Sequence, residues 1–211
     1  MDRRARLESL LAGDGNWVPP AANPAATMVI LKDGHVLLLR RSATMAFAPG
    51  MHVFPGGGLD PLDRSDPDPL RACARRETWE EVSIRIDECT LIDRWVTPEV
   101  EDRRYDVSFF LATTNDDATL TTTEADAMVW LTPAQALQRH GQGQLAMLRP
   151  TVAVLESLLA GTYDKPVDVV PKLPRVRADG LWDVIHAETG ELLGERVAGP
   201  VRAETDGGAL L

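Results

Sequence analysis

The sequence has few cysteines, few lysines and no long apolar run, and each shortage excludes a class of protein. Its 211 residues include only two cysteines, Cys73 and Cys89, which are too few for a disulfide framework or a cysteine-rich zinc site. This cysteine usage fits a reducing, cytoplasmic environment. No stretch approaches the roughly 18 consecutive apolar residues of a membrane-spanning helix. The first residues are charged and lack the apolar core of a secretory signal.

Acidic residues outnumber basic ones. The chain has 22 Lys+Arg and 32 Asp+Glu, a formal net charge of −10. This balance argues against a general nucleic-acid-binding protein, which usually needs a basic face. Only three of the cations are lysine. Arginine suits bidentate contacts with phosphate, although genome base composition explains such a bias equally well.

The apolar pattern predicts an α/β protein. Strands are expected at 27–31, 35–39, 51–54, 91–96, 105–112 and 128–131. Helices are expected at 1–12, 68–81, 132–139 and 149–160. In this order, the helices can flank a mixed sheet.

Composition divides the chain into three parts. We expect an N-terminal arm at residues 1–24, a central domain at 25–163 and a C-terminal appendage at 164–211. The appendage has scattered charge and several prolines. It includes a hairpin-like segment at 181–194, and we expect residues 204–211 to be disordered.

The strongest chemical signal is a group of three glutamates in the second expected helix. Glu77, Glu80 and Glu81 fall within about 100° of arc on one helix face. Three carboxylates on one face repel one another, and Mg²⁺ or Mn²⁺ would remove that penalty because these ions prefer oxygen ligands. Arg76 is four residues before Glu80 and adjacent to Glu77, so it can hold one carboxylate in place. The alternative for such a cluster is a solvated acidic face.

A glycine-rich segment, Phe-Pro-Gly-Gly-Gly-Leu-Asp at 54–60, precedes this helix. Glycines allow backbone carbonyls and amides to approach a metal or a phosphate closely. Together with the glutamates, the segment resembles the Nudix hydrolase signature G-x5-E-x7-R-E-U-x-E-E-x-G-U, in which U is bulky and apolar. The matching positions are Gly57, Arg76, Glu77, Glu80, Glu81 and Ile84.

The match departs from the signature in three places. The gap between Gly57 and Asp68 is five residues longer than the signature allows. Asp68 stands where the family has its first glutamate, eight residues before Arg76, but we favour Asp68 as the N-cap of the helix. Thr78 fills an apolar position, and Ser83 replaces a glycine.

Similarity continues over about residues 25–160 and resembles the branch that contains the peroxisomal coenzyme A diphosphatases. The segments that carry it are 37–42, 45–57, 95–98, 103–112, 130–133 and 148–151. The resemblance implies a Nudix-type α/β/α sandwich, with a mixed sheet flanked by helices, over the central domain. It also implies a hydrolase that cleaves a nucleoside diphosphate linked to another moiety, X, by attack of water on the pyrophosphate. Coenzyme A or a derivative is one candidate substrate, but the chain lacks a C-terminal Ser-Lys-Leu peroxisomal address.

The resemblance also implies roles for single residues. The implied ligands of Mg²⁺ or Mn²⁺ are Glu77, Glu80, Glu81 and the Gly57 carbonyl. The implied catalytic residues are Glu80, Glu81, Arg76 and Glu124, the last because it shares an acid-x5-Trp spacing with family members. The candidates for substrate phosphates are Arg40, Arg41, Arg103 and Arg104, which stand as two adjacent pairs. Since adjacent strand residues point to opposite faces, at most one of each pair should face the site. Plain ion pairs and, for Glu124, an ordinary loop acid are the alternatives.

Two further functions stay open. One is a housecleaning hydrolase of nucleotides or dinucleotides, and the other is a non-catalytic binding or regulatory module with the Nudix fold. The intact glutamates and Arg76 favour an enzyme. We expect a small nucleoside diphosphate derivative as its partner, neither nucleic acid nor membrane, and, from family resemblance, a homodimer.

Overall fold

The computed structural model describes residues 1–163 and 169–193. The strands are β1 (Asn23–Lys32), β2 (His35–Arg41), β3 (His52–Val53), β4 (Gly56–Gly58), β5 (Thr90–Val96), β6 (Tyr105–Thr113), β7 (Ala125–Leu131), β8 (Lys172–Val176) and β9 (Trp182–His186). The helices are α1 (Arg3–Ala12), α2 (Pro69–Val82), α3 (Pro133–Gly141) and α4 (Arg149–Ala160), with a 3₁₀ turn, η1, at Asp63–Ser65. None of the helices in these described residues is long and apolar enough to cross a membrane.

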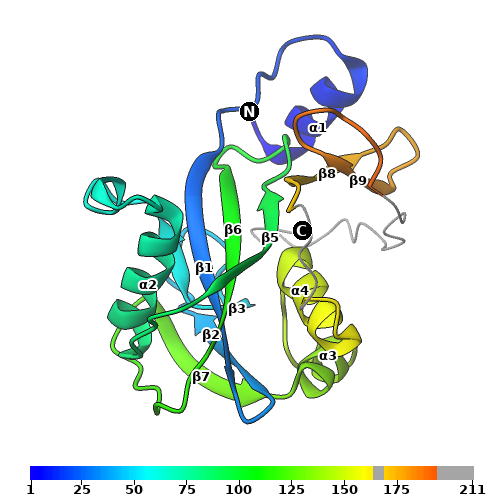
Figure 1. Cartoon of the computed structure of the whole chain (residues 1–211). Helices are drawn as coiled ribbons and strands as arrows, with labels where there is room; N and C mark the ends of the chain where they lie inside the picture. Colours follow the sequence, from blue (N-terminus) through cyan, green and yellow to red (C-terminus); the bar gives the residue numbers. More distant parts are fainter. Residues whose placement is uncertain (164–168, 194–211) are drawn as a thin grey trace.

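The centre of the fold is β1, in a mixed sheet of order β3-β2-β1-β6-β5-β8-β9 (Figure 1). β1 runs parallel to β6 along its whole length. On its other side it pairs antiparallel with β4 at one end and with β2 at the other. β2 continues beyond this contact and pairs with β7. The glycine-rich segment is thereby attached to the central strand.

Helices cover both faces of the sheet, with α2 on one side and α3 and α4 on the other (Figure 1). On the α2 face, Cys73 and Val82 are buried in one apolar cluster with Met28 and Ile30 of β1. On the opposite face, Leu155 of α4 belongs to a second cluster. Because both faces are covered, β1 is an almost continuous buried run instead of an alternating one. The α/β sandwich expected from the sequence is confirmed.

Two segments differ from the sequence-based expectation. No strand is predicted at residues 56–58, which are three consecutive glycines, yet they form β4 and pair with Ala25–Thr27 of β1. The expected hairpin at 181–194 is reduced to a single bridge between Ile185 and Leu192, because the regular partner of β9 is the upstream strand β8. Residues 204–211, expected to be disordered, lie outside the described residues.

The two ends of α2 lie at two of the positions where the chain departs from the Nudix signature, Asp68 and Ser83. Asp68 is the N-cap, accepting a hydrogen bond from the backbone of Arg71, and Pro69 follows at the first helical position. At the other end Ser83 adopts the left-handed conformation, with φ 57°. That conformation favours glycine because a Cβ is strained there.

Replacing Ser83 with glycine should therefore stabilise the fold by about 0.5–1 kcal/mol, the usual penalty for a side chain at such a position. Urea unfolding measures the difference, with Ser83→Ala as the control that keeps the Cβ. Equal stability of the glycine and alanine variants would contradict this explanation.

Candidate active site

Glu77 on α2 lies against the backbone of Gly57 on β4. A Cβ added at Gly57 would overlap the Glu77 carboxylate, so only glycine leaves room for this approach. Burial raises the pKa of Glu77, and the charges of Glu80 and Glu124 raise it further, against the lowering effect of Arg76. The pairing of β4 with β1 therefore places a carboxylate and a bare stretch of backbone in contact.

Glu81, one turn further along α2, is the most deeply buried of the three glutamates, with 8% of its surface exposed. Its Oε2 accepts a hydrogen bond of 2.9 Å from the Gly56 amide. Burial raises the pKa of Glu81 to about 7, and the charges of Glu77 and Glu124 contribute in the same direction. The described residues therefore do not supply enough positive charge to compensate an ionised Glu81.

Glu124 belongs to the same electrostatic neighbourhood although it lies more than 40 residues away in sequence. Its charge raises the pKa values of both Glu77 and Glu81. The Glu124 carbonyl accepts a hydrogen bond of 2.8 Å from the Ser42 amide, which ties the segment before β7 to the end of β2. The structure therefore brings all four predicted glutamates to one region.

Arg76 organises the cluster from one side. Its Nη1 donates hydrogen bonds to the carboxylates of Glu77 at 2.9 Å and Glu80 at 3.0 Å. Its Nε and Nη2 donate to the two carboxylate oxygens of Asp63 at 3.1 and 2.9 Å. Asp63 is only 5% exposed. Burial raises the pKa of Asp63, but the hydrogen bonds and charge of Arg76 outweigh burial and hold it below its usual value.

Sequence reasoning missed Asp63. Asp68 matched the position of the family's first glutamate, but Asp68 pairs with Arg71 and caps the helix. Asp63, in η1, lies six positions after Gly57 and so keeps the G-x5-acid spacing of the signature; the five extra residues lie between this acid and Arg76, with which it pairs. The signal was available in the spacing: counting forward from Gly57 leads to Asp63, whereas counting back from Arg76 leads to Asp68.

The donor chemistry fits a hard divalent cation. In the described ranges 1–163 and 169–193, no three carboxylate, imidazole or thiol groups already enclose a metal position. Arg76 draws Glu77 and Glu80 to itself, and Gly56 holds Glu81. Nevertheless, buried carboxylates with raised pKa values lie beside a backbone cradle that a Cβ would fill. Oxygen donors of this kind suit Mg²⁺ or Mn²⁺.

Replacing Gly57 with alanine should displace the Glu77 carboxylate and weaken activation by Mg²⁺ by about 10–100-fold, as happens when support for a metal ligand is lost. The Mg²⁺ dependence of activity measures this effect. Gly58→Ala is the matched control, since a Cβ there meets nothing within 4 Å. Equal Mg²⁺ dependence of the two variants would show that the close approach of Glu77 to Gly57 does not matter for metal binding.

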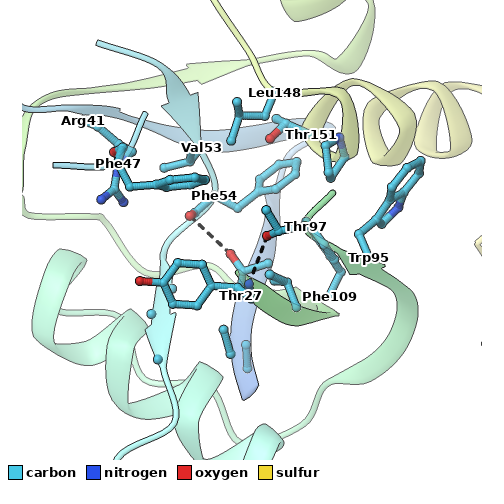
Figure 2. A pocket seen from close by; sticks show the side chains of 18 of the residues that line it. Thr27, Arg41, Phe47, Val53, Phe54, Trp95, Thr97, Phe109, Leu148 and Thr151 are labelled. Atoms are coloured by element: carbon cyan, nitrogen blue, oxygen red, sulfur yellow. Dashed lines mark hydrogen bonds between the residues drawn. The ribbon is translucent and has the colours of Figure 1, made fainter. Parts of the chain in front are cut away.

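A pocket of about 380 Å³ opens beside the glycines (Figure 2). Most of its lining is apolar, and five aromatic rings contribute: Phe47, Phe54, Trp95, Tyr105 and Phe109. In Figure 2, Arg41 and Phe47 lie at one side of the pocket, while Trp95 and Thr151 lie at the other. Glu124 and the backbone of Gly56–Gly58 also line it. The aromatic pocket therefore reaches Glu124 and the glycine backbone that Glu77 and Glu81 contact.

The four predicted arginines separate within each pair, although only Arg40 and Arg41 lie on a strand, β2, while Arg103 and Arg104 precede β6. Arg41 and Arg103 line the pocket. Arg40 points to the other side of β2 and pairs with Asp126 at 2.5 Å. Arg104 is buried and donates to the carbonyls of Thr97 and Pro20, both at 2.9 Å. The cations that face the site are therefore one member of each adjacent pair.

Comparison with known proteins gives a consistent result. Residues 22–149 match the NUDIX domain family. A Nudix hydrolase from Alicyclobacillus acidocaldarius superposes with a TM-score of 0.61 at 28% identity, over 68% of this chain and 94% of that one. The NUDIX domain of Shewanella oneidensis NrtR, solved with ADP ribose, superposes with a TM-score of 0.54 at 16% identity, over 73% and 96% of the two chains, which shows a shared fold.

One relative is similar over a shorter stretch. The NAD-capped RNA hydrolase NudC of Chromobacterium violaceum is 40% identical over 67 residues, which are 32% of this chain and 22% of that protein. The match thus spans about a fifth of that relative's length. Since the NUDIX domain match covers more than half of the chain, the chain belongs to the Nudix family, whose hydrolases act on pyrophosphate bonds.

Proposed function

We propose that this protein is a pyrophosphohydrolase, dependent on Mg²⁺ or Mn²⁺, that cleaves a nucleoside diphosphate linked to a second moiety, X. The observation that carries the proposal is the contact of Glu77 and Glu81 with the Gly56–Gly58 backbone, which also lines an aromatic pocket together with Glu124. Neither half suffices alone, since acidic faces and apolar pockets are both common. Together they match a ligand with an anionic linkage at one end and an apolar or aromatic group at the other.

Glu77, Glu80, Glu81 and the Gly57 carbonyl would hold the cation, which supplies charge neutralisation for the phosphoryl oxygens. Arg76 keeps Glu77 and Glu80 in place through its contacts with both. Arg41 and Arg103, which line the pocket, would contact the phosphates.

The attack of water also needs a proton acceptor. The charge of Glu124 acts on Glu77 and Glu81 from a separate segment, and Glu124 lines the pocket; both observations support Glu124 as the group that takes the proton as the water oxygen bonds to phosphorus. The bridging P–O bond breaks, and the leaving phosphate retains the electron pair. Glu81 is the other residue that could serve as base.

Two choices of X are supported by different observations. Sequence similarity to the coenzyme A diphosphatase branch favours coenzyme A. The match to an NAD-capped RNA hydrolase favours a nicotinamide nucleotide. The aromatic lining of the pocket accommodates either an acyl-carrying chain or a planar ring.

A substrate panel tests the proposal. Purified protein is incubated with Mg²⁺ or Mn²⁺ and with coenzyme A, NADH, ADP-ribose, a dinucleoside polyphosphate or a nucleoside triphosphate, and the products are separated chromatographically. We expect cleavage of at least one compound in which a nucleoside diphosphate carries X, and none in EDTA. Preference for a nucleoside triphosphate would favour a housecleaning hydrolase. Metal binding with no cleavage in the whole panel would overturn the proposal in favour of a binding module.

A further inference from the structure

We infer that the N-terminal arm and the β8–β9 hairpin, two segments outside the strands and helices that carry the carboxylates, together position the wall of the pocket that receives moiety X. This inference rests on the proposed function and deepens it. The wall is the β5–β6 loop, defined as residues 97–104. Thr97, Pro98 and Arg103 of this loop line the pocket. In Figure 2, Thr97 and its neighbour Trp95 lie away from Arg41.

The N-terminal arm contacts the loop at several points, which include an ion pair between Arg3 and Glu101 at 2.8 Å. Trp17 donates from its indole Nε1 to the Glu99 carbonyl at 2.8 Å. Arg6, only 6% exposed, stacks over the Trp17 ring at 5.1 Å and pairs with Asp102 at 3.0 Å. At the end of the loop, Arg104 donates to the Pro20 carbonyl. Such burial of an arginine in a short terminal helix is unusual unless its contacts are structural.

The β8–β9 hairpin contacts the same loop. β8 runs parallel to β5 with Lys172 opposite Trp95, and the Lys172 ammonium pairs with Asp93 at 2.6 Å. Two residues further on, Pro174 enters the lining of the pocket. Arg175 lies 3.6 Å from the Glu99 carboxylate. Glu99 is therefore contacted by the arm through its backbone and by the hairpin through its side chain.

This arrangement points to binding of X and not to the bond-breaking step. The contacts of the arm and hairpin converge on the loop and on Trp95, whereas the carboxylates surround Gly56–Gly58. A loop of eight residues left free would have to be ordered each time a ligand bound, which weakens affinity. Trp17, Arg6 and Pro174 are thus positioning residues for an apolar or aromatic X, and their loss should raise KM while sparing kcat.

Three variants of the full-length protein test the inference. Trp17→Phe removes the indole hydrogen bond to Glu99 but keeps a ring beneath Arg6. Pro174→Trp fills the pocket from the hairpin side. Arg4→Ala is the matched control on α1, because Arg4 is exposed and pairs only within its own helix in the described contacts. Cooperative thermal unfolding and a retained Mg²⁺ thermal shift establish that each variant is folded and keeps its carboxylate site.

Two readouts are measured on each variant: KM and kcat for the best substrate of the panel, and binding of 8-anilinonaphthalene-1-sulfonate, an aromatic anion that fluoresces in apolar sites. For Trp17→Phe we expect KM and the dye dissociation constant to rise by about 3- to 10-fold at nearly constant kcat. For Pro174→Trp we expect a loss of dye affinity of about 10-fold or more. Arg4→Ala should behave as the wild type.

Wild-type dye affinity in both Trp17→Phe and Pro174→Trp would overturn the inference, and so would a fall in kcat at unchanged KM. If the wild-type protein cleaves no compound of the panel, the proposed function fails, and the dye measurements alone decide whether the arm and hairpin position the pocket wall.

Discussion

Replacing Glu81 with glutamine is expected to reduce turnover by at least about 100-fold, the scale of loss when a group that stabilises transition-state charge is removed. Glutamine keeps the size of the side chain and can still accept the hydrogen bond from the Gly56 amide. What it loses is the negative charge at the most buried position of the cluster. A cation held by the remaining carboxylates would be bound more weakly and displaced from the phosphates.

The same substitution should stabilise the metal-free protein at high pH. Burial raises the pKa of Glu81 from 4.5 to about 7. The stability that the protonated group contributes is therefore present in acid and is lost as the pH rises through about 7. Glutamine cannot ionise, so at about pH 8 the metal-free variant should melt several degrees higher than the wild type, and below about pH 4, where the carboxyl is protonated in both the folded and the unfolded state, the two should agree. A change of 1 kcal/mol shifts the Tm of a protein of this size by about 2–4 °C.

Activity assays and thermal melts in EDTA, with and without added Mg²⁺, check both effects together. Mg²⁺ should raise the Tm of the wild type more than that of Glu81→Gln. Glu88→Gln, an exposed site beyond the end of α2, serves as the control and should change neither quantity. Retained turnover in Glu81→Gln would show that Glu81 is not needed for catalysis. A Tm below that of the wild type at about pH 8 without metal would show that the negative charge of Glu81 is compensated in the folded protein.

Sequence reasoning recovered the elements whose identity is decided locally. α2 begins at an aspartate and a proline, and its two ends agree closely with the expected helix at 68–81. β4 was missed because three glycines have no strand propensity, and only the partner strand β1 makes them a strand. The pairing of β8 with β9 was missed for a similar reason, because the hydrophobic pattern of one segment does not show which other strand it will pair with.

The candidate site shows the same division. The helical spacing of Glu77, Glu80 and Glu81 is a local property and was readable directly. The rule that adjacent strand residues face opposite ways predicts that at most one arginine of each pair faces the pocket. It applies to Arg40 and Arg41 on β2 but not to Arg103 and Arg104, which precede β6, and it could not say which member faces the pocket. That choice depends on the register of β2 with β7 and on the contact of Arg104 with Pro20. Asp63 satisfies the G-x5-acid spacing counted from Gly57, but the insertion before Arg76 made the count back from Arg76 point to Asp68.

Arg76 is the second residue at which substitution should have a large effect, this time on folding as well as on activity. Arg76→Ala leaves Asp63 buried without its partner and releases Glu77 and Glu80. Breaking a buried ion pair by removing one partner costs about 3–5 kcal/mol. We therefore expect a Tm lower by roughly 6–20 °C at neutral pH, using the same conversion from free energy to Tm, together with loss of nearly all activity.

The neighbouring residue offers a matched control. Arg75 pairs with Asp87 at 3.8 Å, and Asp87 is 99% exposed, so Arg75→Ala should cost under about 1 kcal/mol. Adding Asp63→Leu to Arg76→Ala removes the stranded carboxylate and should restore part of the stability, because an apolar side chain can replace half of a buried pair. Activity should not return, since Glu77 and Glu80 still lack their anchor. Equal losses of stability in Arg75→Ala and Arg76→Ala would show that Asp63 finds other partners, whereas restored activity in the double variant would show that Arg76 serves the fold and not the glutamates.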